Sequence, residues 1–161
     1  MALARSDPYE KRGNTVTIRG KLFAAALLLT VPAAAVQAQE AGDAAAGEKA
    51  FRKCMACHKI GEGAKNLVGP MLNNVIGRKA GSVEGFRYSP LNVAAGEAGL
   101  VWTEEHIIEY LPDPNAYLKK FLTDAGKPEL AKGATRMTFR LKDEKERRDI
   151  VAYLKTFSEQ K

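Results

Sequence analysis

The feature that most constrains this sequence is the pentapeptide Cys54-Met55-Ala56-Cys57-His58. Its C-x-x-C-H spacing is the attachment signature of a c-type haem. The two thiols lie one helical turn apart, so each can add to a vinyl group on the same edge of a porphyrin. His58 follows directly and is placed to coordinate the iron through an imidazole nitrogen. We therefore expect the chain to fold around a covalently attached haem.

Other uses of this cysteine pair are weaker interpretations. A thioredoxin-like redox pair requires a βαβ context, which the sequence does not show. A zinc site requires four ligands, whereas the one histidine besides His58 is the distant His106. A disulfide between Cys54 and Cys57 would close an unusually tight loop. With two cysteines and two histidines in 161 residues, chance seldom produces this string.

Residues 1–38 are predicted to be an N-terminal extension plus a secretory signal peptide. An uncharged apolar run spans Leu22–Val36, after two basic residues and before small residues that end at Ala38. This order favours cleavage after Ala38. The run is shorter than the roughly 20 residues of a membrane-spanning helix, although an uncleaved anchor stays open as the alternative. Residues 39–161 are then expected to form one domain.

Removing residues 1–38 also changes the charge. The full sequence has 25 Lys and Arg against 19 Asp and Glu, a formal net charge of +6. The first 38 residues hold five of these basic and two of these acidic side chains, which leaves 20 against 17, a net charge of +3. No long basic stripe with interleaved aromatic residues remains, so we expect no binding to nucleic acid.

The pattern of the remaining chain is mainly helical, because no segment alternates with period two. Four helices are predicted, over 43–54, over 103–111, from Asp113-Pro114 onward, and over 143–158. N-cap residues begin them: Asp43, Thr103, Asp113 and Asp143, the last in capping-box spacing with Glu146. The glycine-rich region 59–101 is predicted to be mostly loop, with one short helix near Leu72–Ile76. Gly47 interrupts the first helix and favours the close approach of another helix there.

The sixth ligand of the iron is predicted to be Met137. Outside the motif and residues 1–38, the candidates are Met71, Met137 and His106. Met137 lies in a loop that can carry its thioether over the second face of the haem. Met71 follows Pro70 and is expected to pack in the core, while His106 lies on an exposed turn of a helix. Ligation by histidine and methionine raises the reduction potential and suits electron transfer.

Several motifs together resemble class I c-type cytochromes, most closely the bacterial cytochrome c2 (c550) group related to mitochondrial cytochrome c. The resemblance covers nearly all of residues 43–157. It rests on GEKAFRKCMACH (47–58), GPMLNNVIGRKAG (69–81), GFRYSPLN (85–92), VWTEEHIIEYLPDP (101–114), TRMTF (135–139) and RRDIVAYLK (147–155). It implies an all-α fold whose helices and glycine-rich loops wrap one covalently attached haem c per chain. Its first and last helices would cross tightly at Gly47.

The resemblance also implies roles for residues around the haem. The backbone carbonyl of Pro70 would accept a hydrogen bond from the axial His58. The hydroxyl of Tyr110 would approach the sulfur of Met137. Three further side chains match positions that surround the haem propionates: Arg78, Tyr88 and Trp102. An insertion at about 119–130, typical of the larger c2 type, separates this chain from the mitochondrial pattern.

The function implied by the resemblance is that of a soluble, periplasmic one-electron carrier, not an enzyme. The donor would be a cytochrome bc1-type complex and the acceptor a terminal oxidase or a photosynthetic reaction centre. We expect a monomer. Seven basic side chains are candidates to ring the exposed haem edge and attract acidic partners: Lys53, Lys65, Lys119, Lys120, Lys127, Lys132 and Arg136.

Two alternative functions stay open. One is a membrane-tethered carrier or the dedicated electron acceptor of one dehydrogenase. The other is a gas-binding or peroxidase-like haem protein, which would require that Met137 does not ligate the iron.

Overall fold

The computed structural model describes residues 41–158 of the chain. Its helices, in chain order, are α1 (Ala44–Phe51), α2 (Pro90–Glu97), α3 (Glu104–Tyr110), α4 (Pro114–Asp124), the 3-10 helix η1 (Pro128–Leu130) and α5 (Glu144–Lys155). Within the described range, the β structure is limited to an isolated bridge between Lys79 and Val101. The all-α prediction is confirmed for this part of the chain.

The predicted extension and signal segment, residues 1–38, lies outside the described residues. Among residues 41–158, no helix has the length and apolar character needed to cross a membrane.

The four predicted helix starts are confirmed. In each, a side-chain oxygen accepts a hydrogen bond from a backbone N–H in the first turn: Asp43, Thr103, Asp113 and Asp143. The capping box predicted at α5 forms only in half. Glu146 donates its backbone N–H to Asp143 at 2.7 Å, but its carboxylate pairs with Lys53 instead of returning to the cap. α1 is also shorter than predicted, because the chain leaves the helix at Phe51 and continues in turns over 52–57.

The region 59–101 departs from its prediction. Residues 72–76 contain turns and no helical residue, so the prediction of a short helix near Leu72–Ile76 is wrong. Asn74 has a φ of 55°, and a left-handed residue cannot continue a right-handed helix. The helix of this region is α2, where Ser89 caps the N–H of Asn92 and Pro90 occupies the first helical position. A serine followed by a proline is an ordinary start signal for a helix.

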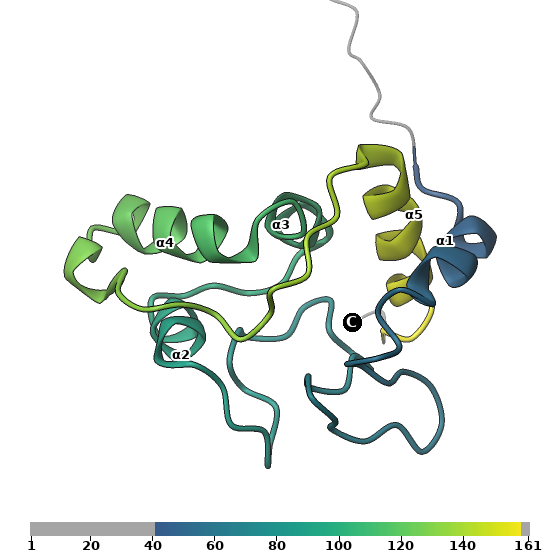
Figure 1. The fold of residues 1–161 in the computed structure, drawn as a ribbon, viewed down its shortest axis with the longest axis horizontal. Coiled ribbons are helices and arrows are strands. Elements are labelled where there is room, and N and C mark those ends of the chain that lie inside the picture. The colour runs from purple at the N-terminus through teal and green to yellow at the C-terminus, as the bar shows by residue number, and fades with distance from the viewer. Residues whose placement is uncertain (1–40, 159–161) are drawn as a thin grey trace, which may run out of the picture. The chain divides into compact units, whose positions relative to one another are not determined.

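The tight crossing predicted at Gly47 is present where α1 packs on α5 (Figure 1). A Cβ on Gly47 would lie 1.9 Å from the carbonyl oxygen of Asp149 and 2.9 Å from the Cβ of Tyr153. The rings of Phe51 and Tyr153 pack beside this contact, with centroids 5.4 Å apart. The Asp43 N–H donates to the Asp149 carboxylate at 2.9 Å. The two helices therefore approach through backbone, which only glycine permits here.

The remaining helices form a second group, in which α4 contacts α2, α3 and η1 (Figure 1). The predicted insertion at 119–130 forms the later part of α4 and η1. Fully buried leucines hold this group together: Leu91, Leu100, Leu118 and Leu122. α3 also contacts α5, which joins the second group to the α1–α5 pair. The loop that carries Met137 runs from η1 back to α5 between these groups.

Replacing Gly47 with alanine tests the crossing. Alanine should gain about 1 kcal/mol of helix propensity, but overpacking of a tight contact costs about 1–3 kcal/mol. Because the contact at Gly47 is with backbone that cannot rotate away, we expect a net loss of about 2 kcal/mol in the free energy of unfolding. Chemical denaturation measures this loss. Glu48→Ala, at an exposed site on the same helix, should change stability by less than about 0.5 kcal/mol. Equal stabilities of the two variants would contradict a backbone contact.

Candidate haem-binding site

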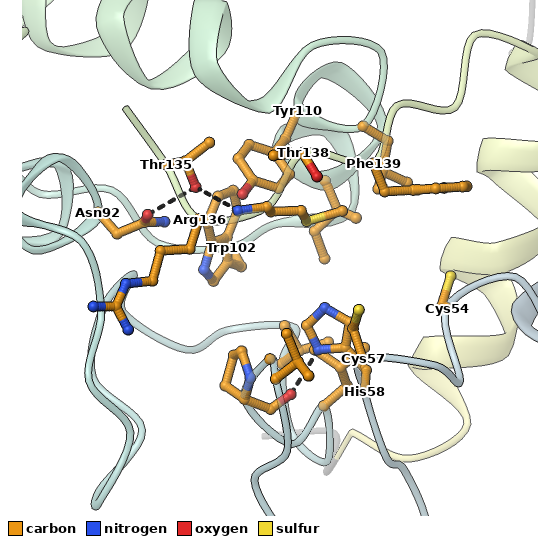
Figure 2. A pocket seen from close by; sticks show the side chains of 18 of the residues that line it. Cys54, Cys57, His58, Asn92, Trp102, Tyr110, Thr135, Arg136, Thr138 and Phe139 are labelled. Carbon is orange, nitrogen blue, oxygen red and sulfur yellow. Dashed lines mark hydrogen bonds between the residues drawn. The ribbon is translucent and has the colours of Figure 1, made fainter. Parts of the chain in front are cut away.

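A cavity of about 390 Å3 is lined both by the cysteine motif and by the segment that contains Met137. Ligand pockets usually measure about 300–1,000 Å3, so this cavity can hold a large part of a prosthetic group. Figure 2 shows Cys57 and His58 on one side of it and Tyr110 and Thr135 on the other. Apolar side chains from α1, α3 and α5 line the space between them: Phe51, Ile107, Ile150 and Leu154.

The cavity brings together most residues that the sequence indicates. Its lining includes Cys54, Cys57, His58, Pro70, Tyr88, Trp102, Tyr110 and Met137. Arg78 is not among the lining residues; its guanidinium donates to the backbone carbonyls of Asn73 at 2.9 Å and Met71 at 3.2 Å. Its charge still reaches the cavity, where it counteracts the rise that burial causes in the pKa of Tyr88.

The imidazole of His58 has one nitrogen committed to the backbone. Nδ1 lies 2.7 Å from the carbonyl oxygen of Pro70, a contact drawn as a dashed line in Figure 2. Because a carbonyl only accepts, Nδ1 carries the proton and Nε2 keeps its lone pair. Burial lowers the pKa of His58, the Pro70 bond opposes this, and the charge of Arg78 adds to the lowering.

Gly69 supports this position of the ring. A Cβ on Gly69 would lie 2.4 Å from Cε1 of His58 and 2.8 Å from each ring nitrogen. The backbone therefore passes directly against the imidazole, and any larger residue would displace it. The Gly69 N–H also donates to the carbonyl of Cys57 at 2.8 Å, which fixes the loop against the motif.

The motif itself forms one turn of backbone. The N–H groups of Cys57 and His58 both donate to the carbonyl oxygen of Cys54, at 3.1 and 2.9 Å. Burial, with the nearby Glu146 carboxylate, raises the pKa of the Cys54 thiol to about 11. Cysteines in dithiol redox motifs have lowered pKa values. Cys54 therefore lacks the acidity of a thioredoxin-like nucleophile.

The opposite side of the cavity contains a chain of buried polar groups. Ser89 Oγ donates to Asn92 Oδ1 at 2.7 Å, and Thr135 Oγ1 donates to the same oxygen at 3.0 Å. The Met137 N–H donates to Thr135 Oγ1 at 3.3 Å (Figure 2). Burial raises the pKa of Tyr110, and hydrogen bonds with Thr135 and Asn92 oppose this rise. These contacts hold the backbone from which the Met137 side chain projects.

Three of these polar residues were not identified as site residues from the sequence: Ser89, Asn92 and Thr135. The available signal was slight. Asn92 is a buried asparagine on a face of α2 whose other buried members are small or apolar, and Thr135 precedes Met137 by two residues. Asn92 and Thr135 are 43 residues apart in the chain, so no local sequence pattern reveals the hydrogen bond between them.

The other two candidate ligands lie elsewhere. His106 is not among the cavity-lining residues; its Nδ1 lies 2.6 Å from the carbonyl oxygen of Val101. Its ring centroid is 6.3 Å from that of Tyr117 and 6.2 Å from that of Phe121. Met71 is half-buried and is also absent from the lining. Met137 is thus the candidate methionine at the cavity.

The donor set of the cavity suits a haem. Within residues 41–158, no group of three or more His, Cys, Asp or Glu is placed to hold a metal ion. The lining instead has one imidazole, one thioether from Met137, two neighbouring thiols and largely apolar walls. A planar macrocycle that brings its own nitrogen ligands requires only two axial donors and an apolar slot. The residues present therefore fit this group.

Comparisons with known proteins agree with this geometry. A family model described as cytochrome c matches residues 44–158. Cytochrome c2 iso-1 of Rhodospirillum centenum is 67% identical over 117 residues, which cover 73% of this chain and 98% of that protein. A cytochrome c2 of Rhodopseudomonas palustris is 60% identical over 114 residues, covering 71% of this chain and 97% of that protein.

Solved structures show the same relationship. The structure of cytochrome c2 from Rhodospirillum centenum superposes with a TM-score of 0.73 at 65% identity, covering 73% of this chain and all (100%) of that one. Ferricytochrome c2 from Rhodopseudomonas palustris gives a TM-score of 0.69 at 58% identity, with 72% and 99% covered. The chain therefore belongs to the cytochrome c family, as a class I c-type cytochrome of the c2 group, whose members carry electrons on a haem and are not enzymes.

Proposed function

We propose that this chain is a soluble, periplasmic carrier of single electrons with one covalently bound haem c. Thioether bonds to Cys54 and Cys57 would hold the haem, and His58 and Met137 would be its axial ligands. The observation that carries the proposal is one cavity with the C-x-x-C-H motif on one wall and Met137 among its lining residues. The cytochrome c2 proteins that this chain resembles support the same assignment.

The haem would supply an iron that cycles between Fe(II) and Fe(III). The protein would supply rigidity. The Pro70 carbonyl orients the imidazole of His58, and Thr135 holds the backbone of Met137. The buried apolar walls of the cavity would exclude water from the iron. Ligands that do not move between oxidation states keep the reorganisation energy small, which is what a carrier requires.

The mouth of the cavity suits transient docking. Val68 and Phe139 line the cavity and are 74% and 38% exposed, so they present an apolar edge. Two basic residues also line the cavity, Lys53 and Arg136, of which Lys53 is paired with Glu146. An apolar centre with cationic neighbours fits an acidic redox partner met by electrostatic steering. We propose a cytochrome bc1-type complex as donor and a terminal oxidase or reaction centre as acceptor.

The N-terminal part of the chain is assigned on its sequence. Residues 1–38 would be removed after Ala38, which would leave residues 39–161 as the working domain in the periplasm. Attachment of a c-type haem takes place outside the cytoplasmic membrane, so an export signal agrees with the motif.

Met137→Ala tests the sixth ligand. Loss of the thioether should lower the reduction potential by more than about 0.1 V, since axial ligands set haem potentials over a range of about 0.8 V. Potentiometric titration measures this change, and the reduced variant should bind carbon monoxide at neutral pH. Met71→Ala is the matched control and should keep the potential. An unchanged potential in Met137→Ala, or ready carbon monoxide binding by the wild type, would favour the gas-binding or peroxidase-like alternative.

Arg136→Glu tests the docking edge. The rate constant for reaction with an acidic redox complex should fall roughly tenfold at low salt, because charge at the contact steers encounter. The difference should vanish near 1 M salt, where the Debye length is about 3 Å. Stopped-flow kinetics against a bc1-type complex or a reaction centre measures both. Lys49→Glu, an exposed charge reversal outside the cavity lining, should change the rate much less. Equal effects would mean that net charge, not the docking edge, controls the rate.

Intact-mass measurement of the exported protein tests the cleavage site. We expect the mass of residues 39–161 plus one haem. Ala38→Arg should block processing, because signal peptidase requires a small residue at that position. A mass that includes Leu22–Val36, in protein that sediments with membranes, would instead support the tethered carrier.

A further inference from the structure

Asn66 uses both ends of its side-chain amide within the loop that leads from the motif to Pro70. Its Oδ1 accepts from the Met71 N–H at 3.0 Å. Its Nδ2 donates to the carbonyl oxygen of Glu84 at 3.1 Å. One partner is a backbone donor and the other a backbone acceptor, so together they determine which end of the amide faces which. Asn66 is half-buried.

The N–H of Met71 belongs to the same peptide group as the carbonyl of Pro70. A trans peptide is planar, and its N–H and C=O point in opposite directions. Anchoring this N–H on Asn66 therefore sets the direction of the Pro70 carbonyl, whose oxygen lies 2.7 Å from Nδ1 of His58. Hydrogen bonds at the two ends of one amide also polarise each other, so the bond at Asn66 makes the carbonyl a stronger acceptor.

Neighbouring contacts hold other peptide groups. The Gly69 N–H donates to the carbonyl of Cys57 at 2.8 Å, and Arg78 donates to the carbonyl of Met71 at 3.2 Å. These contacts fix the Val68–Gly69 peptide and the Met71–Leu72 peptide. Asn66 acts on the Pro70–Met71 peptide itself, at the end opposite to the imidazole.

We propose that Asn66 is a positioning residue for His58, acting through the Pro70–Met71 peptide to strengthen the hydrogen bond on Nδ1. This inference rests on the proposed ligation of the iron by His58. A stronger hydrogen bond on Nδ1 makes the imidazole a more electron-rich ligand. An electron-rich ligand favours Fe(III), so Asn66 lowers the reduction potential of the haem-loaded protein.

Three variants of the haem-loaded protein test the proposal. Asn66→Ala removes both hydrogen bonds of this side chain. Asn66→Asp keeps an acceptor for the Met71 N–H, as a carboxylate, and loses the donor to Glu84. Asn73→Ala is the matched control, because Asn73 bridges the same loop through the N–H and carbonyl of Gly61, at 3.0 and 2.9 Å, and has no side-chain bond to the peptide in question.

The deciding readout is the NMR resonance of the His58 Nδ1 proton in the reduced, diamagnetic protein. We expect it to move upfield in Asn66→Ala, where its hydrogen bond weakens, and downfield in Asn66→Asp, where a carboxylate polarises the peptide more strongly. It should stay in place in Asn73→Ala, although that variant also loses stability. The reduction potential should rise in Asn66→Ala and not in Asn73→Ala.

A loss of stability in Asn66→Ala without movement of this proton would make Asn66 a loop bridge only and overturn the proposal. If Asn66→Ala does not fold, Asn66→Asp decides, because a downfield shift supports the proposal and no shift or an upfield shift contradicts it. Failure of the underlying ligation is separate. In that case the wild type itself would lack the spectrum of a six-coordinate, histidine-ligated haem.

Discussion

The backbone contact between α1 and α5 at Gly47 is the constraint on which the site depends. It brings the carbonyl of Asp149 against α1, a helix that ends at Phe51, three residues before the first cysteine of the motif. The same crossing directs Ile150 and Leu154 of α5 into the cavity. A wider separation of these helices would move the cysteines away from the apolar wall that they share.

The two sides of the cavity are held in different ways. Around His58, the constraints are short-range backbone contacts, in which Gly69, Pro70 and Met71 bond to groups of the surrounding loop. Around Met137, they are buried side chains from distant parts of the chain, Asn92 and Thr135. Both arrangements restrict the motion of His58 and of the Met137 backbone, because separating a buried polar group from its hydrogen-bond partner costs free energy. An electron carrier needs this restriction on both faces of its haem.

Local signals predicted much of the fold. Asp43, Thr103, Asp113 and Asp143 cap their helices because an N-cap needs only a side-chain oxygen and an N–H within one turn. The helix expected near Leu72–Ile76 does not form. The reason is again local, because the backbone of Asn74 is left-handed. The pattern of apolar residues cannot predict that conformation, because a short apolar turn and a short apolar helix have the same composition.

The amino-acid sequence by itself predicted which residues would attach and ligate a haem, and it determined where most of the helices begin and which family the chain belongs to. These properties reside in motifs that are complete within a few residues. Only the tertiary structure decided which polar groups meet. Lys53 pairs with Glu146, 93 residues away in the chain, and Thr135 donates a hydrogen bond to Asn92, 43 residues away. Arg78 donates a hydrogen bond to a backbone carbonyl instead of lining the cavity. Such contacts depend on how the helices pack, and the same side chains would serve as solvated surface groups in another packing.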